Sequence, residues 1–509
     1  MAFTMTVAKL IDADTSGMLG KHATWERVQL AEVATILNGA PFDSALFSTT
    51  EGMPLIRIRD VTTGQTNTYY TGAYEDAYLV QQGDLLVGMD GDFNSGFWGS
   101  KAALLNQRVC KISPVESFYD KRLLAFTLPG YLAAINANTP SVTVKHLSSK
   151  TIGEIGFPLP PRAEQTRIVA KLEELLSDLD VGVAELKAAQ KKLGQYRQSL
   201  LKAAVEGALT AGWRNQNRPT ETGAQLLERI LTERRARWEA KQLTKFAEQG
   251  KTPPKDWQKK YPEPVQPDTT DLPELPDGWV WATLSQVGWL DRGRSKHRPR
   301  NAPHLYGGPY PFVQTGDIRH ADTFLSDVEA SYSEAGLAQS RLWPAGTICI
   351  TIAANIGKTA ILSMEACFPD SVVGFLSGSD DVSIRYVEYF MRSVQQKLED
   401  EAPATAQKNI NLEILEKVAI PVPPTLEQHE IVQMLDDSLG AARESNRAID
   451  LSLKQSAAQR QNILKAAFSG QLVPQDPNDE SASVLLERIR AAHDAVKKPR
   501  GRKAKEASL

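Results

Sequence analysis

The chain has 509 residues, of which 42% are hydrophobic and 23% are charged, and its formal net charge is −3. This length predicts roughly three domains, and the ordinary composition excludes a chain that is disordered throughout. The near-neutral charge neither indicates nor excludes a nucleic-acid partner, because a local basic patch can lie within a neutral total.

Cysteine usage and hydropathy give an expectation about the compartment. Cys110, Cys349 and Cys367 are widely spaced and form no C-x-x-C pair, which argues against a disulfide framework and a zinc site. The first residues show no basic segment followed by an apolar run, and no window of about 18 apolar residues occurs. We expect a soluble protein of the reducing cytoplasm, without a membrane partner or a bound metal.

The chain opens with a short extension and a strand-rich segment. Residues 1–24 form an N-terminal extension without an assigned role. Residues 25–157 contain short apolar runs bounded by Gly, Asn and Pro, a pattern that predicts strands. We expect a mixed α/β domain over 25–157.

A helical region is predicted next, over 158–230. The stretch FPLPPRAEQTRIV (157–169) opens with prolines that force an extended backbone, and Glu164 then falls in a first helical turn, where it favours the helix dipole. One leucine recurs every seven residues, which is the signature of a coiled coil. The leucines of this heptad seam are Leu172, Leu179, Leu186, Leu193 and Leu200.

The rest of the chain alternates in the same way. Residues 231–275 are charged and rich in proline, so we expect a helix to about Gly250 and then an extended linker. A second α/β domain is expected over 276–420, a second helical region over 421–490 and a basic disordered tail over 491–509. The second seam is weaker and contains Leu435, Leu439, Ile449 and Leu453.

The two helical regions are copies of each other. IPVPPTLEQHEIV (420–432) follows the first copy after 263 residues, without a gap. The same spacing relates RQSLLKAAVEGAL (197–209) to RQNILKAAFSGQL (460–472), and LLERI occurs at both 226–230 and 485–489. Self-similarity over such a length indicates an internal repeat with pseudo-two-fold character.

The two domains share a fainter plan. PLIRIRDV (54–61) parallels PFVQTGDI (311–318), and LVQQGDLLV (79–87) parallels LWPAGTICI (342–350). The segment that begins at Trp25 is matched to the one that begins at Trp281. Because the stretches between these anchors do not match, we expect similar scaffolds with different variable surfaces.

Three arrangements of the long helices remain open from the residues alone. The leucine-rich strip of the first helix can pack against the small-residue strip of the second within one chain, which costs less association entropy than dimerisation. Two separate surface helices, each covering its own domain, are the first alternative. A parallel homodimeric zipper is the second.

No catalytic motif is recognisable. AANIGKTA (353–360) resembles a phosphate-binding loop, but Ile352 stands where that motif needs glycine, so Lys358 is expected in a surface loop or on a phosphate. No G-x-G-x-x-G after a strand, H-E-x-x-H, G-x-S-x-G or Asn/Asp-Pro-Pro-Tyr/Phe motif occurs. We expect no active site in this chain.

The densest cationic cluster is DRGRSKHRPRNAP (291–303), whose prolines and glycine predict a loop. Arginine and asparagine side chains can bond to guanine and adenine edges, and the cluster lies in a variable part of its domain. A solvated surface is the plainer interpretation. The candidate DNA contacts in this loop are Arg294, Lys296, His297, Arg298, Arg300 and Asn301.

The first domain has a thinner set of candidates. Arg57 and Arg59 lie on a strand-like run, and Asn94 and Lys101 lie in the loop GMDGDFNSGFWGSK (88–101). Alternate residues of a strand commonly face solvent without a function, so each of these four is a weak candidate.

The doubled arrangement resembles the specificity subunit of Type I restriction–modification enzymes. The shared features are two variable domains, each followed by a helix that begins P-x-P-P-x-x-E-Q and ends L-K-A-A-x-x-G-x-L, between about Trp25 and Ile489. LPELPDGWVWATLSQVG (272–288), QTGDI (314–318) and VKHLSSKTIGEIGFPLPP (144–161) resemble the same family. Lys145 and Gln314 lie in these stretches and, together with Lys358, complete the set of candidate DNA contacts.

The resemblance implies an α+β protein whose two target-recognition domains are separated by two long helices in an antiparallel coiled coil. Each domain would recognise one half of a bipartite, asymmetric sequence in double-stranded DNA. The helices would set the gap and bind two modification subunits, which supply S-adenosylmethionine and adenine methylation. Two restriction subunits would add ATP- and magnesium-dependent translocation and cleavage, so this chain would itself bind no cofactor.

Two rival functions are open. A zipper-type homodimeric DNA-binding regulator would need a continuous basic helix before the coil, but the residues before Leu172 are broken by proline and poor in cations. A scaffold whose two domains bind proteins across a rigid spacer would need no DNA contact at all.

Overall fold

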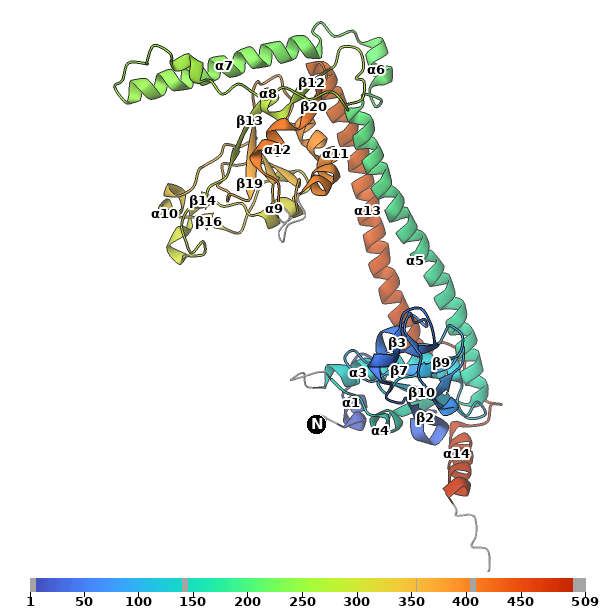
Figure 1. Cartoon of the computed structure of the whole chain (residues 1–509). Coiled ribbons are helices and arrows are strands. Elements are labelled where there is room, and N and C mark those ends of the chain that lie inside the picture. Colours follow the sequence, from blue (N-terminus) through green and yellow to red (C-terminus); the bar gives the residue numbers. More distant parts are fainter. Residues whose placement is uncertain (1–5, 140–144, 354, 403–408, 498–509) are drawn as a thin grey trace, which may run out of the picture. The chain divides into compact units, whose positions relative to one another are not determined.

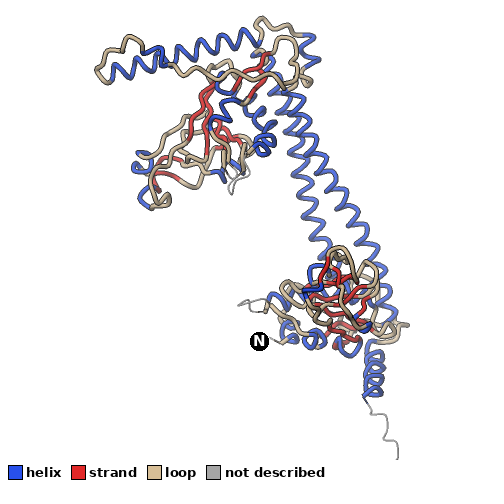
Figure 2. The backbone as a smooth tube through the Cα atoms, viewed as in Figure 1, coloured by secondary structure: helices blue, strands red, loops and turns tan. Residues whose placement is uncertain are grey.

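The computed structural model describes residues 6–139, 145–353, 355–402 and 409–497. The chain forms two compact units, one from residues up to 187 together with those from 450 onwards, and one from residues 188–449. Each unit contains one α/β domain and adjoining parts of two long helices (Figures 1 and 2). The expected α+β class with an internal repeat is confirmed.

The domain of the first unit is built on two sheets and a short ladder. The sheets have the strand orders β2-β10-β7-β8 and β3-β5-β4-β9-β6, and β1 pairs antiparallel with β11. The closing strand therefore returns to the opening strand just before the long helix begins. The strands are β1 (Glu26–Gln29), β2 (Ala34–Asn38), β3 (Phe47–Ser48), β4 (Met53–Ile56), β5 (Tyr69–Tyr70), β6 (Leu79–Val80), β7 (Leu85–Gly88), β8 (Asn94–Phe97), β9 (Ala103–Leu105), β10 (Val109–Pro114) and β11 (Gly156–Leu159).

The helices of this domain complete its core. The N-cap of α3 is Asp120, whose carboxylate accepts from the backbone N–H of Arg122 at 2.9 Å, and α3 then buries an apolar face. The helices, including three 3₁₀ turns, are α1 (Val7–Asp12), α2 (Leu30–Val33), η1 (Ser44–Leu46), η2 (Ile58–Asp60), η3 (Asp76–Tyr78), α3 (Lys121–Ala137) and α4 (Ser149–Gly153).

The N-terminal extension belongs to this domain, which the sequence did not indicate. Leu10 on α1 and Leu19 after it are buried in the domain core. The guanidinium of Arg27 donates to the carbonyl of Leu19 at 2.5 Å, which ties the extension to β1. Residues 6–24 thus cover apolar surface that would otherwise be exposed.

The domain of the second unit repeats the four-strand order and the closing ladder of the first, but its other sheet is smaller. Its main sheet has the order β13-β19-β17-β18-β15, β12 pairs with β20, and β14 pairs with β16. The order β13-β19-β17-β18 corresponds strand for strand to β2-β10-β7-β8. The strands are β12 (Val280–Thr283), β13 (Gly288–Arg292), β14 (Tyr306–Pro311), β15 (Phe324–Leu325), β16 (Ser331–Tyr332), β17 (Ile348–Thr351), β18 (Thr359–Leu362), β19 (Val372–Ser377) and β20 (Ala419–Val422).

The helices of the second domain also correspond to those of the first. The helices α11 and α12 occupy the places of α3 and α4 between the last sheet strand and the closing strand. They and the other helices are α8 (Leu284–Val287), η5 (Pro303–Leu305), α9 (Thr315–His320), α10 (Glu334–Ala338), α11 (Ile384–Glu401) and α12 (Leu412–Lys417).

The faint sequence parallels between the domains are largely confirmed, with one correction. Gly83 and Gly346, in the second parallel, both turn into a sheet strand with positive φ values of 84° and 83°. The match of Trp25 to Trp281 is wrong by two residues, because Trp279 directly precedes β12 as Trp25 precedes β1. The two tryptophans so close together, Trp279 and Trp281, made the register ambiguous in the sequence.

The long helices are α5 (Arg162–Val205) and α13 (Thr425–Phe468), each of 44 residues, and 263 residues separate both their starts and their ends. In the first unit Arg460 of α13 pairs with Asp180 of α5. In the second unit Arg197 of α5 donates to the carbonyl of Ala442 on α13 at 3.2 Å. As the residue number rises along one helix it falls along the other, so the two helices are antiparallel.

Burial along the heptad seam is uneven. Leu172, Leu435 and Leu439 are buried, because each also belongs to the core of the domain beside it. The other seam residues are partly exposed, including Leu179 and Leu200, which lie at the margins of the two domain cores. The half-buried seam residues are Leu179, Leu186, Leu193, Leu200, Ile449 and Leu453.

The expected linker at 231–275 is largely folded. The helix α7 (Gly223–Glu248) extends into it and ends close to the predicted Gly250, and η4 (Trp257–Lys260) then turns back, because Trp257 stacks on Trp238 with 5.8 Å between ring centroids. Backbone N–H of Val265 donates to Ser285 at 3.0 Å, so the prolines that follow lie along the second domain.

Residues 491–497, which were expected to belong to a disordered tail, are helical. The helix α14 (Ala482–Lys497) continues past residue 491, because its apolar residues Leu485 and Ile489 are buried in the core of the first unit. Residues 498–509, on which the rest of that prediction falls, lie outside the described residues. In the described part of the chain, no helix is long and apolar enough to span a membrane.

Candidate functional site

Each long helix starts with the same Glu-Gln pair, and the glutamine bonds to the domain that precedes the helix. Its side-chain oxygen accepts a hydrogen bond from the backbone N–H of the residue that caps α3 or α11. Its side-chain nitrogen donates to a carbonyl of the proline run. The partners are Asp120 (2.8 Å) and Pro160 (3.0 Å) for Gln165, and Ser383 (2.9 Å) and Pro423 (3.0 Å) for Gln428. The proline-led motif is therefore a joint between domain and helix.

The glutamate of the pair is buried, at 1% exposure in both repeats, and accepts an indole N–H. Trp25 donates to Glu164 at 3.0 Å, and Trp279 donates to Glu427 at 2.9 Å. Loss of solvent around the carboxylate raises the pKa of Glu164, and the hydrogen bonds oppose that shift. The sequence predicted these glutamates in a first helical turn but gave no sign of their burial.

The segment that follows the other long helix completes each joint. In the second unit, Thr210 donates to Glu427 at 2.7 Å and Arg214 donates to it at 2.7 and 2.9 Å. In the first unit, Gln475 donates to Glu164. Each glutamate thus connects an α/β domain, the start of one long helix and the chain that leaves the other.

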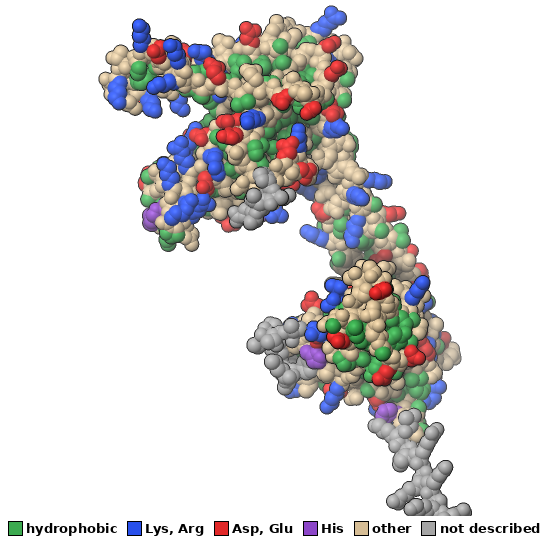
Figure 3. Space-filling model, in the orientation of Figure 1, with side chains coloured by type: hydrophobic (Ala, Val, Ile, Leu, Met, Phe, Trp, Pro, Cys, Tyr) green, Lys and Arg blue, Asp and Glu red, His purple; other side chains and the backbone are tan. Residues whose placement is uncertain are grey.

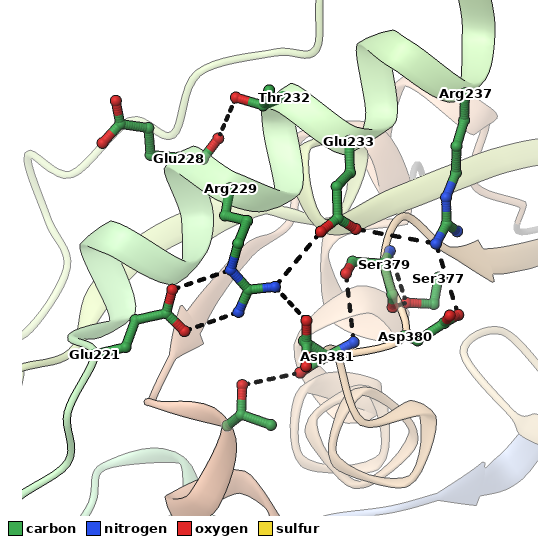
Figure 4. A network of polar contacts seen from close by, with 11 residues as sticks. Glu221, Glu228, Arg229, Thr232, Glu233, Arg237, Ser377, Ser379, Asp380 and Asp381 are labelled. Carbon is green, nitrogen blue, oxygen red and sulfur yellow. Dashed lines mark hydrogen bonds and ion pairs between the residues drawn. The ribbon is translucent and has the colours of Figure 1, made fainter. Parts of the chain in front are cut away.

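Arg229 on α7 holds a polar network that fixes this helix to the second domain (Figure 4). Its guanidinium bonds to both carboxylate oxygens of Glu221 at 2.8 and 3.1 Å and to Asp381 in the loop before α11. Glu233 lies 3.5 Å away, and the gathered acceptors raise the pKa of Arg229. In the first unit the equivalent Arg488 of α14 pairs with Glu480 at 3.1 Å.

The cationic loop of the second domain lies between β13 and η5. Its side chains differ in how firmly the protein's own acceptors hold them. The guanidinium of Arg300 binds both oxygens of Asp370 at 2.8 and 2.9 Å. Arg298 donates to the carbonyls of Ser295 and His297 at 2.6 and 2.8 Å, which braces the loop from within.

The other loop candidates are less constrained. Arg294 is half-exposed and 3.9 Å from Asp291, and the ring of His297 meets His304 edge-on at 5.0 Å. Lys296 and Asn301 are exposed and have no hydrogen-bond or ion-pair partner among the described residues. The loop therefore presents a braced backbone with several polar ends directed to solvent.

Arg57 and Gln314 occupy the same position in the two repeats. Backbone N–H of Arg57 donates to Asp60 and that of Gln314 donates to Asp317, both at 2.8 Å, at the turn that follows a sheet strand. Both side chains are exposed. One scaffold position thus carries a cation in one repeat and a neutral amide in the other.

The remaining candidates of the first domain differ in exposure and in their hydrogen-bond partners. Arg59 and Lys101 are exposed, whereas the ammonium of Lys145 donates to the backbone and side-chain oxygens of Asn136 at 2.6 and 2.8 Å. Asn94 on β8 is half-buried, and its side-chain oxygen has no partner within the described part of the chain. Arg59 and Lys101 are therefore freer to meet a ligand than Lys145 and Asn94.

Lys358 lies in a hollow with cations that the sequence did not connect to it. Its backbone N–H donates to Thr351 at 3.1 Å, which closes the loop expected from the sequence. The hollow also receives Arg197, Arg319, Arg392 and Arg443. No sequence signal could join them, because they come from five separate elements or loops of the second unit.

Positive side chains are unevenly distributed on the visible surface. Figure 3 shows Lys and Arg gathered over the β14 and α10 end of the second domain and over α7, while the visible face of the first domain has more hydrophobic side chains. This agrees with the thinner set of cations in the sequence of the first domain.

The sequence raised two further points, the state of the cysteines and the presence of metal ligands. All three cysteines are buried and unpaired, and burial raises the pKa of Cys110 to about 12, so its thiol remains protonated. Among the described residues, no group of three or more His, Cys, Asp or Glu side chains is arranged to hold a metal ion.

Comparisons with known proteins identify relatives along nearly the whole chain. The model of the Type I restriction modification DNA specificity domain matches residues 22–185 and 276–455. The Type I restriction enzyme EcoBI specificity subunit of Escherichia coli is 32% identical, over 97% of this chain and 98% of that protein. The EcoDI specificity subunit, also of Escherichia coli, is 24% identical over 76% of this chain and 80% of its own.

The fold has a counterpart among solved structures. A chain from a structure on the complex assembly and conformational transition of the type I R-M system superposes with a TM-score of 0.61 at 18% identity. The superposition covers 88% of this chain and 98% of the other. The two chains share one fold.

Proposed function

Because the chain belongs to the Type I restriction–modification DNA specificity family, we propose that each of its two domains recognises one half of a bipartite, asymmetric DNA site. The observation that carries this proposal is the pairing of equal scaffolds with unequal exposed side chains. Arg57 and Gln314 share one backbone position, and only the second repeat has the cationic loop around Arg300. Two identical surfaces would bind a symmetric site, whereas unlike surfaces bind unlike half-sites.

The long helices are proposed to set the gap between the half-sites. Each has 44 residues, which corresponds to roughly 66 Å at 1.5 Å per residue. The buried Glu-Gln joints fix where each helix leaves its domain, so the length of the helices, rather than a flexible linker, determines the spacing.

We also propose that this chain binds the modification and restriction subunits that the family resemblance implies. Two modification subunits would bring S-adenosylmethionine, and two restriction subunits would bring ATP and magnesium. This chain would supply sequence recognition without an active site of its own. The repeated surfaces of α5 and α13 give two equivalent places for two equal subunits.

The test is selection of random duplexes by the full chain, followed by sequencing of the bound DNA. We expect a split motif with a fixed gap. A contiguous palindrome would instead indicate a zipper-type regulator, and the absence of any enriched sequence would indicate a protein scaffold.

Single substitutions assign the half-sites. We expect Arg300→Ala to relax one half of the motif and Arg59→Ala the other, each by about 1–3 kcal/mol if a base contact is lost. Equal changes in both halves from either variant would contradict the division of recognition between the domains.

A further inference from the structure

A cationic hollow lies in the second unit between the paired helices and the recognition domain. It has a volume of about 290 Å³ and is lined by residues of α5, α13, α9, α11 and the start of β18. A water molecule takes up about 30 Å³, so the hollow has room for a larger anion together with bound water. Five cationic side chains line it, against the single carboxylate of Asp322. The cations are Arg197, Arg319, Lys358, Arg392 and Arg443.

Two of the five cations are held by the protein's own acceptors. Arg392 bonds to the buried carboxylate of Glu388 and to Thr323 at 3.2 Å. Arg443 lies 3.3 Å from Asp322. These two side chains form a fixed wall of the hollow.

The other three cations have unused bonding capacity. Arg197 donates through one nitrogen to the carbonyl of Ala442, while its Nε is buried without a partner among the described residues. Arg319 and the ammonium of Lys358 likewise have no hydrogen-bond or ion-pair partner in the described part of the chain. The Nε of Arg197 is enclosed by the protein, so the donors free to meet an anion in the hollow are those of Arg319 and Lys358.

The first unit has a hollow at the equivalent place, and its lining does not carry an excess of positive charge. Arg460 corresponds to Arg197 after 263 residues and also lines a hollow there. Asp180, which corresponds to Arg443, pairs with Arg460 and neutralises it. Arg460 is the one cation in the lining of that hollow among the described residues, and it lies there with two carboxylates, Glu173 and Asp180, and with apolar side chains such as Phe126.

The charge reversal from Asp180 to Arg443 is the informative difference. If the helix–domain contact required only packing, either repeat could keep the neutral arrangement found in the first unit. Like charges that converge in a concave, partly desolvated site repel one another and concentrate a positive potential. In the second unit Asp322 and Glu388 pair with two of the five cations, and the other three have no carboxylate partner among the described residues.

We propose that this hollow binds a phosphate group, and that the phosphate belongs to the DNA backbone beside the half-site recognised by the second domain. The assignment of the phosphate to DNA rests on the proposed function. The phosphate site itself rests on the cations that line the hollow. Arginine and lysine donors are suited to phosphate oxygens, and a backbone phosphate carries no base identity. The hollow would therefore position the duplex without selecting its sequence.

The test uses the salt dependence of duplex binding by the full chain. Each neutralised phosphate contributes about 0.9 to the slope of log K against log salt. We expect the double variant Arg319→Gln, Lys358→Gln to lower this slope by about 0.9 and to weaken binding by one uniform factor for all duplexes. The preferred sequence should be unchanged. Neither side chain has a hydrogen-bond or ion-pair partner among the described residues, so the thermal midpoint should not fall below that of the wild type.

A matched control comes from the other repeat. Arg460→Gln removes the counterpart of Arg197, which Asp180 already neutralises in the first unit, so its salt slope should equal that of the wild type. An unchanged slope in the double variant would overturn the proposal. So would a changed sequence preference at constant slope, because the side chains would then contact bases.

A second measurement separates backbone phosphate from free phosphate. Inorganic phosphate is compared with chloride at equal ionic strength, without DNA, by the thermal midpoint of the wild type and of the double variant. Stabilisation of the wild type alone, with an unchanged DNA salt slope, would keep the phosphate site but overturn its assignment to DNA. A lower salt slope in the double variant without any enriched sequence would uphold the phosphate site while the proposed half-site recognition fails. An enriched split motif with an unchanged slope would uphold half-site recognition and overturn the phosphate site.

Discussion

The indole nitrogen of Trp279 donates to the carboxylate of Glu427 across 2.9 Å, and both side chains are buried. Trp25 and Glu164 repeat this relationship in the first unit at 3.0 Å. The bond joins the residue just before the first strand of a domain to the first turn of a long helix. Since a spacer transmits a fixed distance only if its ends are rigid, this joint is the structural basis of the proposed gap.

Removing the buried carboxylate should destabilise the second unit strongly. Glu427→Ala leaves Arg214, Thr210 and the Trp279 indole without their acceptor, and loss of one partner of a buried ion pair costs about 3–5 kcal/mol. Urea unfolding of the full chain measures the change. Glu444→Ala, an exposed position on the same helix, is the control and should stay within about 0.5 kcal/mol of the wild type. Equal effects would show that the joint does not limit stability.

The corresponding joint in the first unit should be sensitive to pH. Burial raises the pKa of Glu164, so the folded state holds this proton more tightly than the unfolded state does. The stabilisation from that proton is complete below the unfolded pKa of about 4.3 and is lost as pH rises through the folded pKa. We expect the unfolding free energy of wild type minus that of Glu164→Gln to fall as pH rises from 4 towards 7. A difference that rose with pH would contradict the assignment.

Arg229 and Arg488 form a matched pair for testing how α7 is attached. Arg229 bonds to Glu221 and Asp381 and lies near Glu233, whereas Arg488 has one acidic partner, Glu480. Because Arg229 is more than a third exposed, we expect Arg229→Ala to cost only about 1 kcal/mol. Hydrogen exchange should nevertheless rise in the first turns of α7. The same substitution at Arg488 should change exchange in α14 less, and equal changes would remove the special role of the network.

Equal changes in the length of both long helices should alter the gap and nothing else. One added heptad in α5 and one in α13 lengthens the pair by about 10.5 Å, which corresponds to roughly three base pairs at 3.4 Å per step. Duplex selection should then return the same two half-sites with a longer gap. If the half-sites themselves changed, the helices would take part in recognition.

The repeat and its helices could be predicted from sequence because their signals are local. Prolines that exclude a helix, followed by Glu164 or Glu427, located the starts of α5 and α13 to within a few residues. The seven-residue leucine spacing predicted a pairing surface. It did not predict that Leu186 and Leu193 would be only half-buried, since exposure depends on whether a domain lies behind the helix.

The partners of the candidate contacts could not be predicted for the same reason. Composition identified the loop that carries Arg300, but not its bond to Asp370, which lies 70 residues further along the chain. Lys358 was expected in a loop or on a phosphate, whereas its neighbours Arg319 and Arg443 had no signal at all. Lys145 was a candidate on family likeness, and the structure shows its ammonium bonded to Asn136.

The sequence by itself determined the doubled plan of this protein, the ends of its long helices and the family to which it belongs. Those properties depend on backbone restriction, on periodicity and on similarity between segments, all of which are visible along the chain. Only the tertiary structure decided that Glu164 and Glu427 are buried acceptors and that five cations converge beside the second domain. Burial and charge density are properties of three-dimensional neighbourhoods, because folding brings together residues that the chain keeps far apart.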